Sequence, residues 1–166
     1  MTTLVLMRHG VAEDDNPGGE AARRLTPEGL ERAGLAAQGL VALGMRPDLV
    51  LTSPLVRCRQ TAELVAGAAR CPLEDDLRLA PGMSASDLIE VIIENPEALT
   101  LLACTHQPGL TYALADLTGC GQIGFKRPGA AVVELQAPRL GAGRLVAVLP
   151  PRVLRAAAEP HSQSAP

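Results

Sequence analysis

Apolar and polar residues alternate along this chain in blocks that predict strands and helices in turn. Short apolar runs that end in polar or turn-forming residues are typical of buried strands. Such runs occupy residues 3–7, 48–52 and 99–104. Between them, apolar residues recur every three or four positions, which predicts amphipathic helices. The helices predicted in this way cover about 27–43, 53–68, 84–95 and 107–119.

The last part of the chain departs from this alternation. Two strands, predicted at about 130–136 and 144–149, follow one another with no helix between them, whereas 72–83 shows no clear periodicity. Alternating strands and helices favour an α/β fold, here a three-layer α/β/α sandwich around a mostly parallel sheet, and the two late strands predict an antiparallel edge. We expect a single domain over 1–155 and a flexible C-terminal tail over 156–166.

Composition narrows the range of partners. The 166 residues include 15 basic and 18 acidic side chains, and the formal net charge of −3 leaves no excess positive charge to bind a polyanion. Only Tyr112 and Phe125 are aromatic, so little is available to stack on bases. No apolar run approaches the length of a membrane span, and the first is too short for a secretory signal. We therefore expect neither nucleic acid nor a membrane as a partner.

The cysteines lack the paired spacing of a metal site and lie far apart in the sequence. They are Cys58, Cys71, Cys104 and Cys120. We interpret them as buried thiols in a reducing compartment, which predicts a cytoplasmic protein. None has the spacing to an arginine that would hold a phosphate against a thiolate, so cysteine is not the expected nucleophile.

Residues with possible chemical roles follow three of the predicted strands. Arg8-His9-Gly10 follows the first strand, Ser53 and Arg57 follow the second, and His106 follows the strand at 99–104. In sheets of this class, ligands bind beyond the carboxyl ends of the strands. We therefore expect these side chains to lie together.

Two histidines and two arginines fit a site for phosphoryl transfer. A neutral imidazole is a good nucleophile towards phosphorus. Nearby guanidinium groups lower the pKa of the imidazole and bind phosphoryl oxygens through two parallel hydrogen bonds. His9 is the candidate nucleophile, with Arg8 and Arg57 as the arginines. His106 would stabilise charge on the phosphoryl oxygens, and Gly10 would let the backbone approach the ligand.

Each of these residues also has a purely structural interpretation. A histidine or arginine at the end of a strand is often only a hydrogen-bonded support. Arg57 competes for its role with Arg59, two positions further on, and Ser53 is by default a helix cap.

Four segments, taken together, resemble the signature motifs of the histidine phosphatase (phosphoglycerate mutase-like) superfamily. They are Leu6–Gly10, similar to R-H-G; Arg23–Gly29, similar to R-x-L-T-x-x-G; Ser53–Ala62, similar to S-P-x-x-R-x-x-Q-T-A; and Thr105-His106, similar to the second histidine site. They match the family in order and spacing across about residues 3–118. The chain length and the short stretch 72–98 resemble the small SixA-like phosphohistidine phosphatases.

The resemblance implies a phosphoglycerate mutase-like fold and hydrolysis through a phosphohistidine on His9. Arg8, Arg57 and His106 would then hold the phosphoryl oxygens. Arg23 would line the pocket as a further substrate-binding residue, with its neighbour Arg24 as the alternative. The resemblance implies no cofactor and no metal.

The substrate depends on whether the chain supplies an acid. Larger relatives insert elements that enclose the substrate and provide a carboxylic acid, whereas 72–98 leaves little room for a lid and offers only Asp87. Expelling an alkoxide requires such an acid, but an imidazole leaves far more readily. We therefore expect a phosphorylated protein, bearing phosphohistidine, as the substrate. A small phosphorylated metabolite, such as a sugar or nucleotide phosphate, is the alternative if Asp87, Glu13 or Asp14 supplies the proton. An inactive phosphate- or partner-binding module is the alternative from another class.

Overall fold

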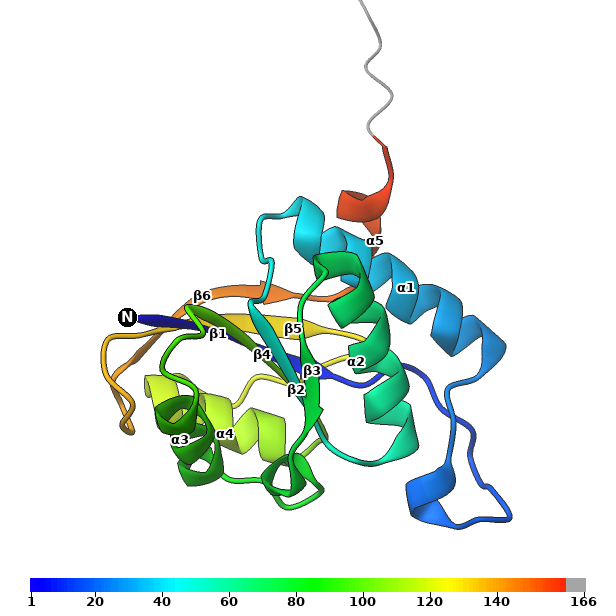
Figure 1. The fold of residues 1–166 in the computed structure, drawn as a ribbon, viewed down its shortest axis with the longest axis horizontal. Coiled ribbons are helices and arrows are strands. Elements are labelled where there is room, and N and C mark those ends of the chain that lie inside the picture. The colour runs from blue at the N-terminus through cyan, green and yellow to red at the C-terminus, as the bar shows by residue number, and fades with distance from the viewer. Residues whose placement is uncertain (161–166) are drawn as a thin grey trace, which may run out of the picture.

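Helices cover both faces of a six-stranded sheet, as Figure 1 shows. The computed structural model describes residues 1–160. In the spatial order of the sheet, the strands are β3 (Leu73–Asp75), β2 (Leu49–Thr52), β4 (Thr100–Thr105), β1 (Thr2–Arg8), β5 (Ala130–Leu135) and β6 (Gly143–Leu149). The helices are α1 (Pro27–Ala42), α2 (Val56–Ala69), α3 (Ala85–Glu94), α4 (Gly109–Thr118) and α5 (Pro151–Ala158), with short 3₁₀ turns η1 (Glu20–Ala22) and η2 (Leu77–Leu79).

The strand directions confirm a mostly parallel sheet with an antiparallel edge. β3, β2, β4 and β1 run parallel to one another, and β5 and β6 pair antiparallel beside β1. The carboxyl ends of the parallel strands therefore meet at one edge of the sheet. The start of β5 lies at the same edge, because Ala130 pairs with Met7 near the end of β1.

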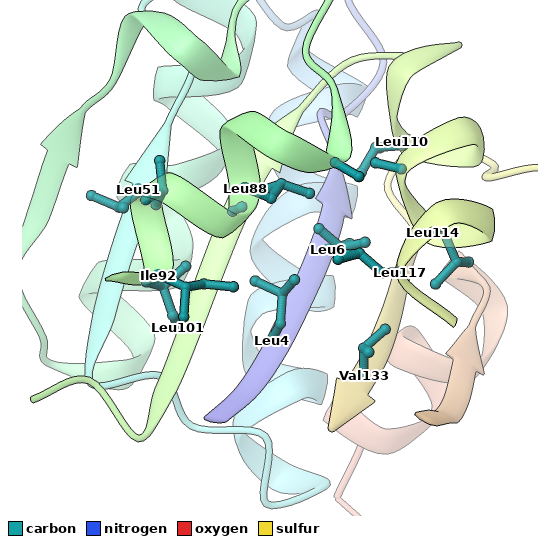
Figure 2. Packing of buried hydrophobic residues seen from close by; sticks show 14 of the residues in the cluster. Leu4, Leu6, Leu51, Leu88, Ile92, Leu101, Leu110, Leu114, Leu117 and Val133 are labelled. Atoms are coloured by element: carbon teal, nitrogen blue, oxygen red, sulfur yellow. The ribbon is translucent and has the colours of Figure 1, made fainter. Parts of the chain in front are cut away.

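Alternate residues of the central strands supply two separate apolar layers. In β1, Leu4 and Leu6 belong to the layer beneath α3 and α4, which Figure 2 shows from close by. Val5 and Met7 belong to the opposite layer, beneath α1, α2 and α5. Burial on both faces explains why the central strands appear in the sequence as continuous apolar runs. Within residues 1–160, no helix combines the length and apolarity needed to cross a bilayer.

Local sequence signals set most helix starts. Thr26 caps α1, because its hydroxyl accepts a hydrogen bond from the backbone N–H of Gly29 at 2.9 Å. Ser84 caps α3 in the same way. The expected cap at Ser53 is wrong, because α2 begins only at Val56 and Ser53 is used for another purpose.

Two elements escaped the sequence prediction. β3 is a three-residue edge strand inside the segment that showed no periodicity. α5 has eight residues, of which Leu154 is fully buried against α1. The expected tail at 156–166 therefore begins too early, because α5 continues to Ala158. Residues 161–166, including His161, lie outside the described residues.

The expectation of buried thiols is correct for two of the four cysteines. Cys58 and Cys104 are buried between the sheet and α2, whereas Cys71 and Cys120 are partly exposed. All four are free thiols.

The packing of α5 on α1 predicts the effect of a single added methyl group. An added Cβ at Gly39 would lie 1.9 Å from the carbonyl oxygen of Leu154. We expect Gly39→Ala to lower the free energy of unfolding by about 1–3 kcal/mol, because backbone must move to accept it. The matched control is Gly34→Ala in the same helix, where a Cβ meets nothing within 4 Å. It should raise stability by about 0.5–1 kcal/mol through helix propensity. Denaturant unfolding of both variants measures the difference, and equal effects would contradict this packing.

Candidate active site

Three parallel strands bring the predicted histidines together at the carboxyl edge of the sheet. His9 follows β1 and His106 follows β4, and their ring centroids are 5.4 Å apart. Arg57, from the first turn of α2, lies beside both rings. All three residues are buried, with 4–6% of their surface exposed. Such burial of polar groups requires that they satisfy one another by hydrogen bonds.

His9 has one ring nitrogen bonded to backbone and the other directed at Arg57. Its Nδ1 lies 2.7 Å from the carbonyl oxygen of Gly10. A carbonyl only accepts hydrogen bonds, so Nδ1 carries the proton and Nε2 carries the lone pair. Nε of Arg57 donates to this Nε2 at 3.3 Å. The backbone of the next residue therefore fixes which ring nitrogen of His9 carries the lone pair.

The surroundings of His9 favour its neutral form. Burial is the largest cause of a pKa lowered from 6.5 to about 3, and the positive charges of Arg57 and Arg8 act in the same direction. The hydrogen bond to the Gly10 carbonyl opposes the shift but does not offset it. His9 is thus a neutral imidazole at neutral pH, with its one ring proton on Nδ1.

Arg57 connects the histidines to the loop above them. Its Nη2 approaches Nδ1 of His106 at 3.4 Å and also donates to the carboxylate of Glu20 at 2.9 Å. Its Nη1 donates to the backbone oxygen of Glu20 at 3.0 Å. Arg59, the alternative from the sequence, is 45% exposed and forms its ion pairs on the surface. Of these two arginines, it is therefore Arg57 that lies between His9 and His106.

Ser53 orients the second histidine. Its hydroxyl lies 2.8 Å from Nε2 of His106, and Arg57 donates towards Nδ1 on the other side of the ring. Because Nδ1 accepts, Nε2 carries the proton and donates to Ser53. The buried thiol of Cys58 also contacts this ring, 3.4 Å from Nε2. Sequence reasoning assigned Ser53 to a helix cap, although it opens the S-P-x-x-R motif.

Arg8 reaches the site from the end of β1, where a second loop holds it. Its Nη1 donates to the backbone oxygen of Phe125 at 2.6 Å. Its Nε is buried and has no hydrogen-bond partner within residues 1–160. Burial, and then the charge of Arg127, lower the pKa of Arg8 below its usual value. No sequence motif indicated Phe125, because the contact uses only its backbone.

Gly10 is required by packing around the turn that follows β1. An added Cβ would lie 3.2 Å from the side chain of Leu25 and 3.3 Å from the backbone oxygen of Gly29. The backbone N–H of Gly10 already donates to the Thr61 hydroxyl at 3.0 Å, so it is not available to a ligand. The amide of Gln60 accepts from the backbone of Leu25 at 2.7 Å. The motif residues Gln60 and Thr61 thus fasten the loop between β1 and α1 onto α2.

Arg23 lies behind Glu20 at the rim of the site. Its Nη1 donates to both carboxylate oxygens of Glu20, at 3.0 and 2.9 Å, and its Nε donates to the backbone oxygen of Glu13 at 2.6 Å. Arg24 is exposed, and its backbone N–H binds the Glu13 carboxylate at 3.0 Å, a bond that lowers the pKa of that carboxyl. Glu13 therefore holds the loop together. Asp14 is exposed beside it.

Asp87, the loose candidate for an acid, forms a helix cap. Its carboxylate accepts from the backbone N–H and the hydroxyl of Ser84, both at 2.7 Å, and the Ser84 hydroxyl accepts from its backbone in return. This is a capping box, in which the carboxylate acts as a hydrogen-bond acceptor. The carboxyl is therefore fixed at the start of α3.

Comparison with known proteins places this geometry in a family. The sequence profile of the histidine phosphatase superfamily (branch 1) matches residues 4–80. An uncharacterised protein of Picosynechococcus sp. (strain ATCC 27264 / PCC 7002 / PR-6) is 38% identical over 126 residues, which are 73% of this chain and 75% of the relative. The structure of the protein histidine phosphatase SixA complexed with tungstate superimposes with a TM-score of 0.83, at 26% identity, over 92% of this chain and 99% of that one.

The chain belongs to the histidine phosphatase superfamily. Its likeness to SixA covers 92% of the chain and so extends beyond residues 4–80, which the profile matches. A variant of phosphoserine phosphatase from Entamoeba histolytica, in complex with phosphoserine, has a TM-score of 0.69 at 19% identity and covers 93% of this chain and all of its own. This second likeness shows the shared fold. Membership of the superfamily supports a phosphatase activity, and the residues at the sheet edge are the candidates to carry it.

The lowered pKa of His9 gives a testable pH dependence. In unfolded chains a histidine has a pKa of about 6.5, so between pH 6.5 and 3 the unfolded state binds a proton that the folded state excludes. Stability contributed by neutral His9 is therefore lost as pH falls through this range. Nitrogen NMR should show His9 unprotonated at Nε2 at pH 5, with His9→Asn identifying the signal. A midpoint near 6.5 would contradict the proposed environment.

Asp87→Ala separates a capping role from an acid role. Loss of the capping box should lower the free energy of unfolding by about 1 kcal/mol and leave kcat/KM unchanged. Glu90→Ala, on an exposed position of the same helix, is the control and should change stability by less than about 0.5 kcal/mol. Chemical denaturation and steady-state kinetics measure both effects. A tenfold loss of kcat/KM in a stably folded Asp87→Ala protein would restore Asp87 as the acid.

Proposed function

We propose that this histidine phosphatase hydrolyses phosphohistidine on proteins through a covalent phosphoryl group on His9. The observation that carries the proposal is the protonation pattern of His9, with Nδ1–H on the Gly10 carbonyl and the Nε2 lone pair facing Arg57. The buried Nε of Arg8, which lacks a partner within the described residues, supplies a donor that a phosphoryl oxygen would satisfy. Arg57 supplies further donors beside Nε2 of His9, and His106 lies next to the same arginine.

In the first step, Nε2 of His9 attacks phosphorus and the P–N bond to the substrate imidazole breaks. The departing nitrogen keeps the bonding electron pair. When the other ring nitrogen of the substrate carries a proton from solvent, the leaving group is a neutral imidazole. Arg8, Arg57 and His106 would stabilise the charge on the transferring oxygens.

In the second step, water attacks the phosphorus of phospho-His9. Because Nδ1 keeps its proton on the Gly10 carbonyl, the phosphorylated ring is cationic and is a good leaving group. The P–Nε2 bond breaks, its electron pair returns to Nε2, and water gives up one proton to solvent as inorganic phosphate forms. The hydrogen bond from Nδ1 to the Gly10 carbonyl would thus support both the attack of Nε2 on phosphorus and the later release of Nε2 from phosphorus.

The carboxylates around the site favour phosphohistidine over a phosphate ester as substrate. Asp87 is held in its capping box and Glu13 holds the loop. The two arginines at Glu20 stabilise its carboxylate, and hydrogen bonding from Arg23 lowers the pKa of that group. Asp87, Glu13 and Glu20 are thus engaged as hydrogen-bond acceptors, which does not favour any of them as the acid that an alkoxide would need. An imidazole leaving group does not need such an acid.

The surroundings of the site favour a protein substrate over an enclosed metabolite. The stretch 72–98 is occupied by β3, η2 and α3, and α3 packs against the apolar layer of the sheet. A phosphohistidine side chain on a protein surface would therefore reach the site from outside. The free thiols fit a reducing compartment, so we place this activity in the cytoplasm.

The test compares kcat/KM on a phosphohistidine-bearing protein with kcat/KM on phosphoserine, sugar phosphates and nucleotide phosphates, all in the presence of a chelator. We expect a strong preference for phosphohistidine in the wild type. His9→Ala should lose at least about a thousandfold in kcat/KM, since it removes the nucleophile. Asp87→Ala, which leaves the site intact, should retain activity and acts as the control for folding.

Two outcomes would contradict the proposal. A preference for small esters would show that the chain supplies an acid, and would favour the phosphomonoesterase alternative. An active, folded His9→Ala protein would remove the covalent mechanism. If the wild type binds phosphate but turns over none of these substrates, the inactive binding module is the better description.

A further inference from the structure

Glu20 places a carboxylate on the guanidinium that has to receive the substrate. Nη2 of Arg57 donates to Oε1 of Glu20 at 2.9 Å, and Nη1 donates to the Glu20 backbone oxygen at 3.0 Å. Nε of the same guanidinium lies on His9. All three nitrogens of Arg57 therefore form hydrogen bonds before any substrate binds. A phosphoryl group can form two parallel hydrogen bonds with this arginine only by displacing one of these partners.

The exposure of the two ionic partners shows which one can move. The Arg57 side chain is 5% exposed and held by the site, whereas the Glu20 side chain is 65% exposed. Glu20 is the first residue of η1, on the loop between β1 and α1 that extends beyond the helices in Figure 1. Arg23 donates to both oxygens of the same carboxylate and gives it a second partner at the rim. The carboxylate can therefore leave Arg57 without losing all its cationic partners.

We infer that Glu20 is an internal competitor for the phosphoryl site, which lowers the affinity of the enzyme for phosphate and other tetrahedral anions. This inference rests on the proposed function only in taking Arg57 as a phosphoryl-binding residue. Glu20 weakens anion binding whether its carboxylate leaves Arg57 or stays there. If it leaves, anion binding costs an ion pair, and if it stays, its negative charge repels the bound anion.

The consequence for the reaction is easier release of product. Inorganic phosphate is the last species bound to Arg57, and the returning carboxylate would replace it there. An ionised carboxylate can do this at neutral pH, because hydrogen bonding from Arg23 lowers the pKa of Glu20. Glu20 thus sets the affinity of the site for anions and takes no part in bond breaking.

The test uses tungstate, a tetrahedral dianion, as the probe, because its binding needs no turnover. The three proteins are the wild type, Glu20→Gln and Glu28→Gln. Glu28 is the matched control, since it is 64% exposed and pairs with Arg32 on α1. We expect calorimetry to show tungstate binding about three- to tenfold tighter in Glu20→Gln than in the wild type, and unchanged in Glu28→Gln. The inhibition constant for inorganic phosphate should fall by the same factor in Glu20→Gln.

A thermal readout separates competition from a merely structural effect. Without ligand, Glu20→Gln should have the lower Tm, because Arg57 has lost its anion. Saturating tungstate should then raise the Tm of Glu20→Gln more than that of the wild type. A merely structural defect would lower both the Tm without ligand and the rise in Tm that tungstate produces.

The other outcomes of the tungstate experiment distinguish the inference about Glu20 from the proposed function. Equal or weaker tungstate binding in a folded Glu20→Gln protein would overturn the inference and leave hydrolysis untouched. Tighter tungstate binding in a chain that hydrolyses no phosphohistidine would support the inference and overturn the proposed function alone. No tungstate binding in any of the three proteins would also overturn the inference, and the kinetic comparison on phosphohistidine would then decide the proposed function by itself.

Discussion

The arrangement of the site depends on one buried guanidinium. Arg57 is 4% exposed, and removing such a charge from water costs several kcal/mol unless hydrogen bonds and a counter-charge replace the lost hydration. Its partners come from three separate parts of the chain: His9 after β1, His106 after β4, and Glu20 on the loop before α1. The need to satisfy this one group therefore fixes the relative positions of His9, His106 and the loop that carries Glu20.

The same constraint links the site to the stability of the fold. Apolar layers on both faces of the sheet bury the ends of β1 and β4, and this burial keeps His9 neutral. Arginine charges beside it act in the same direction, so the features that make Nε2 a nucleophile also make protonation unfavourable. A buried neutral histidine lowers the stability of the fold at acidic pH, because the unfolded chain binds a proton that the folded chain does not bind. Activity and acid sensitivity thus have one physical cause.

Sequence alone predicted the site where it depends on strand order and motif residues. His9 and His106 follow strands that are recognisable as buried apolar runs, and parallel strands bring such residues to one edge. It gave the wrong role to Ser53, because a serine before a proline and a helix has the same pattern whether it caps the helix or orients a histidine. It gave no indication of Glu20, whose contact with Arg57 spans 37 residues and depends on the path of a loop. α5 was missed because eight residues with few large apolar side chains carry too weak a periodicity, although Leu154 decides its packing.

The hydrogen bond from His9 to its neighbour's carbonyl suggests why such a small site can serve hydrolysis. A histidine nucleophile must first give its lone pair and later accept it back, and these demands usually conflict, because a better nucleophile is a poorer leaving group. In the proposed mechanism the proton on Nδ1 stays with the Gly10 carbonyl throughout, so the ring would be neutral before attack and cationic after it. The change of charge would come from phosphorylation itself, with no further proton transfer at the ring. Such a mechanism needs donors for the phosphoryl oxygens, and the residues at three strand ends are the candidates to supply them.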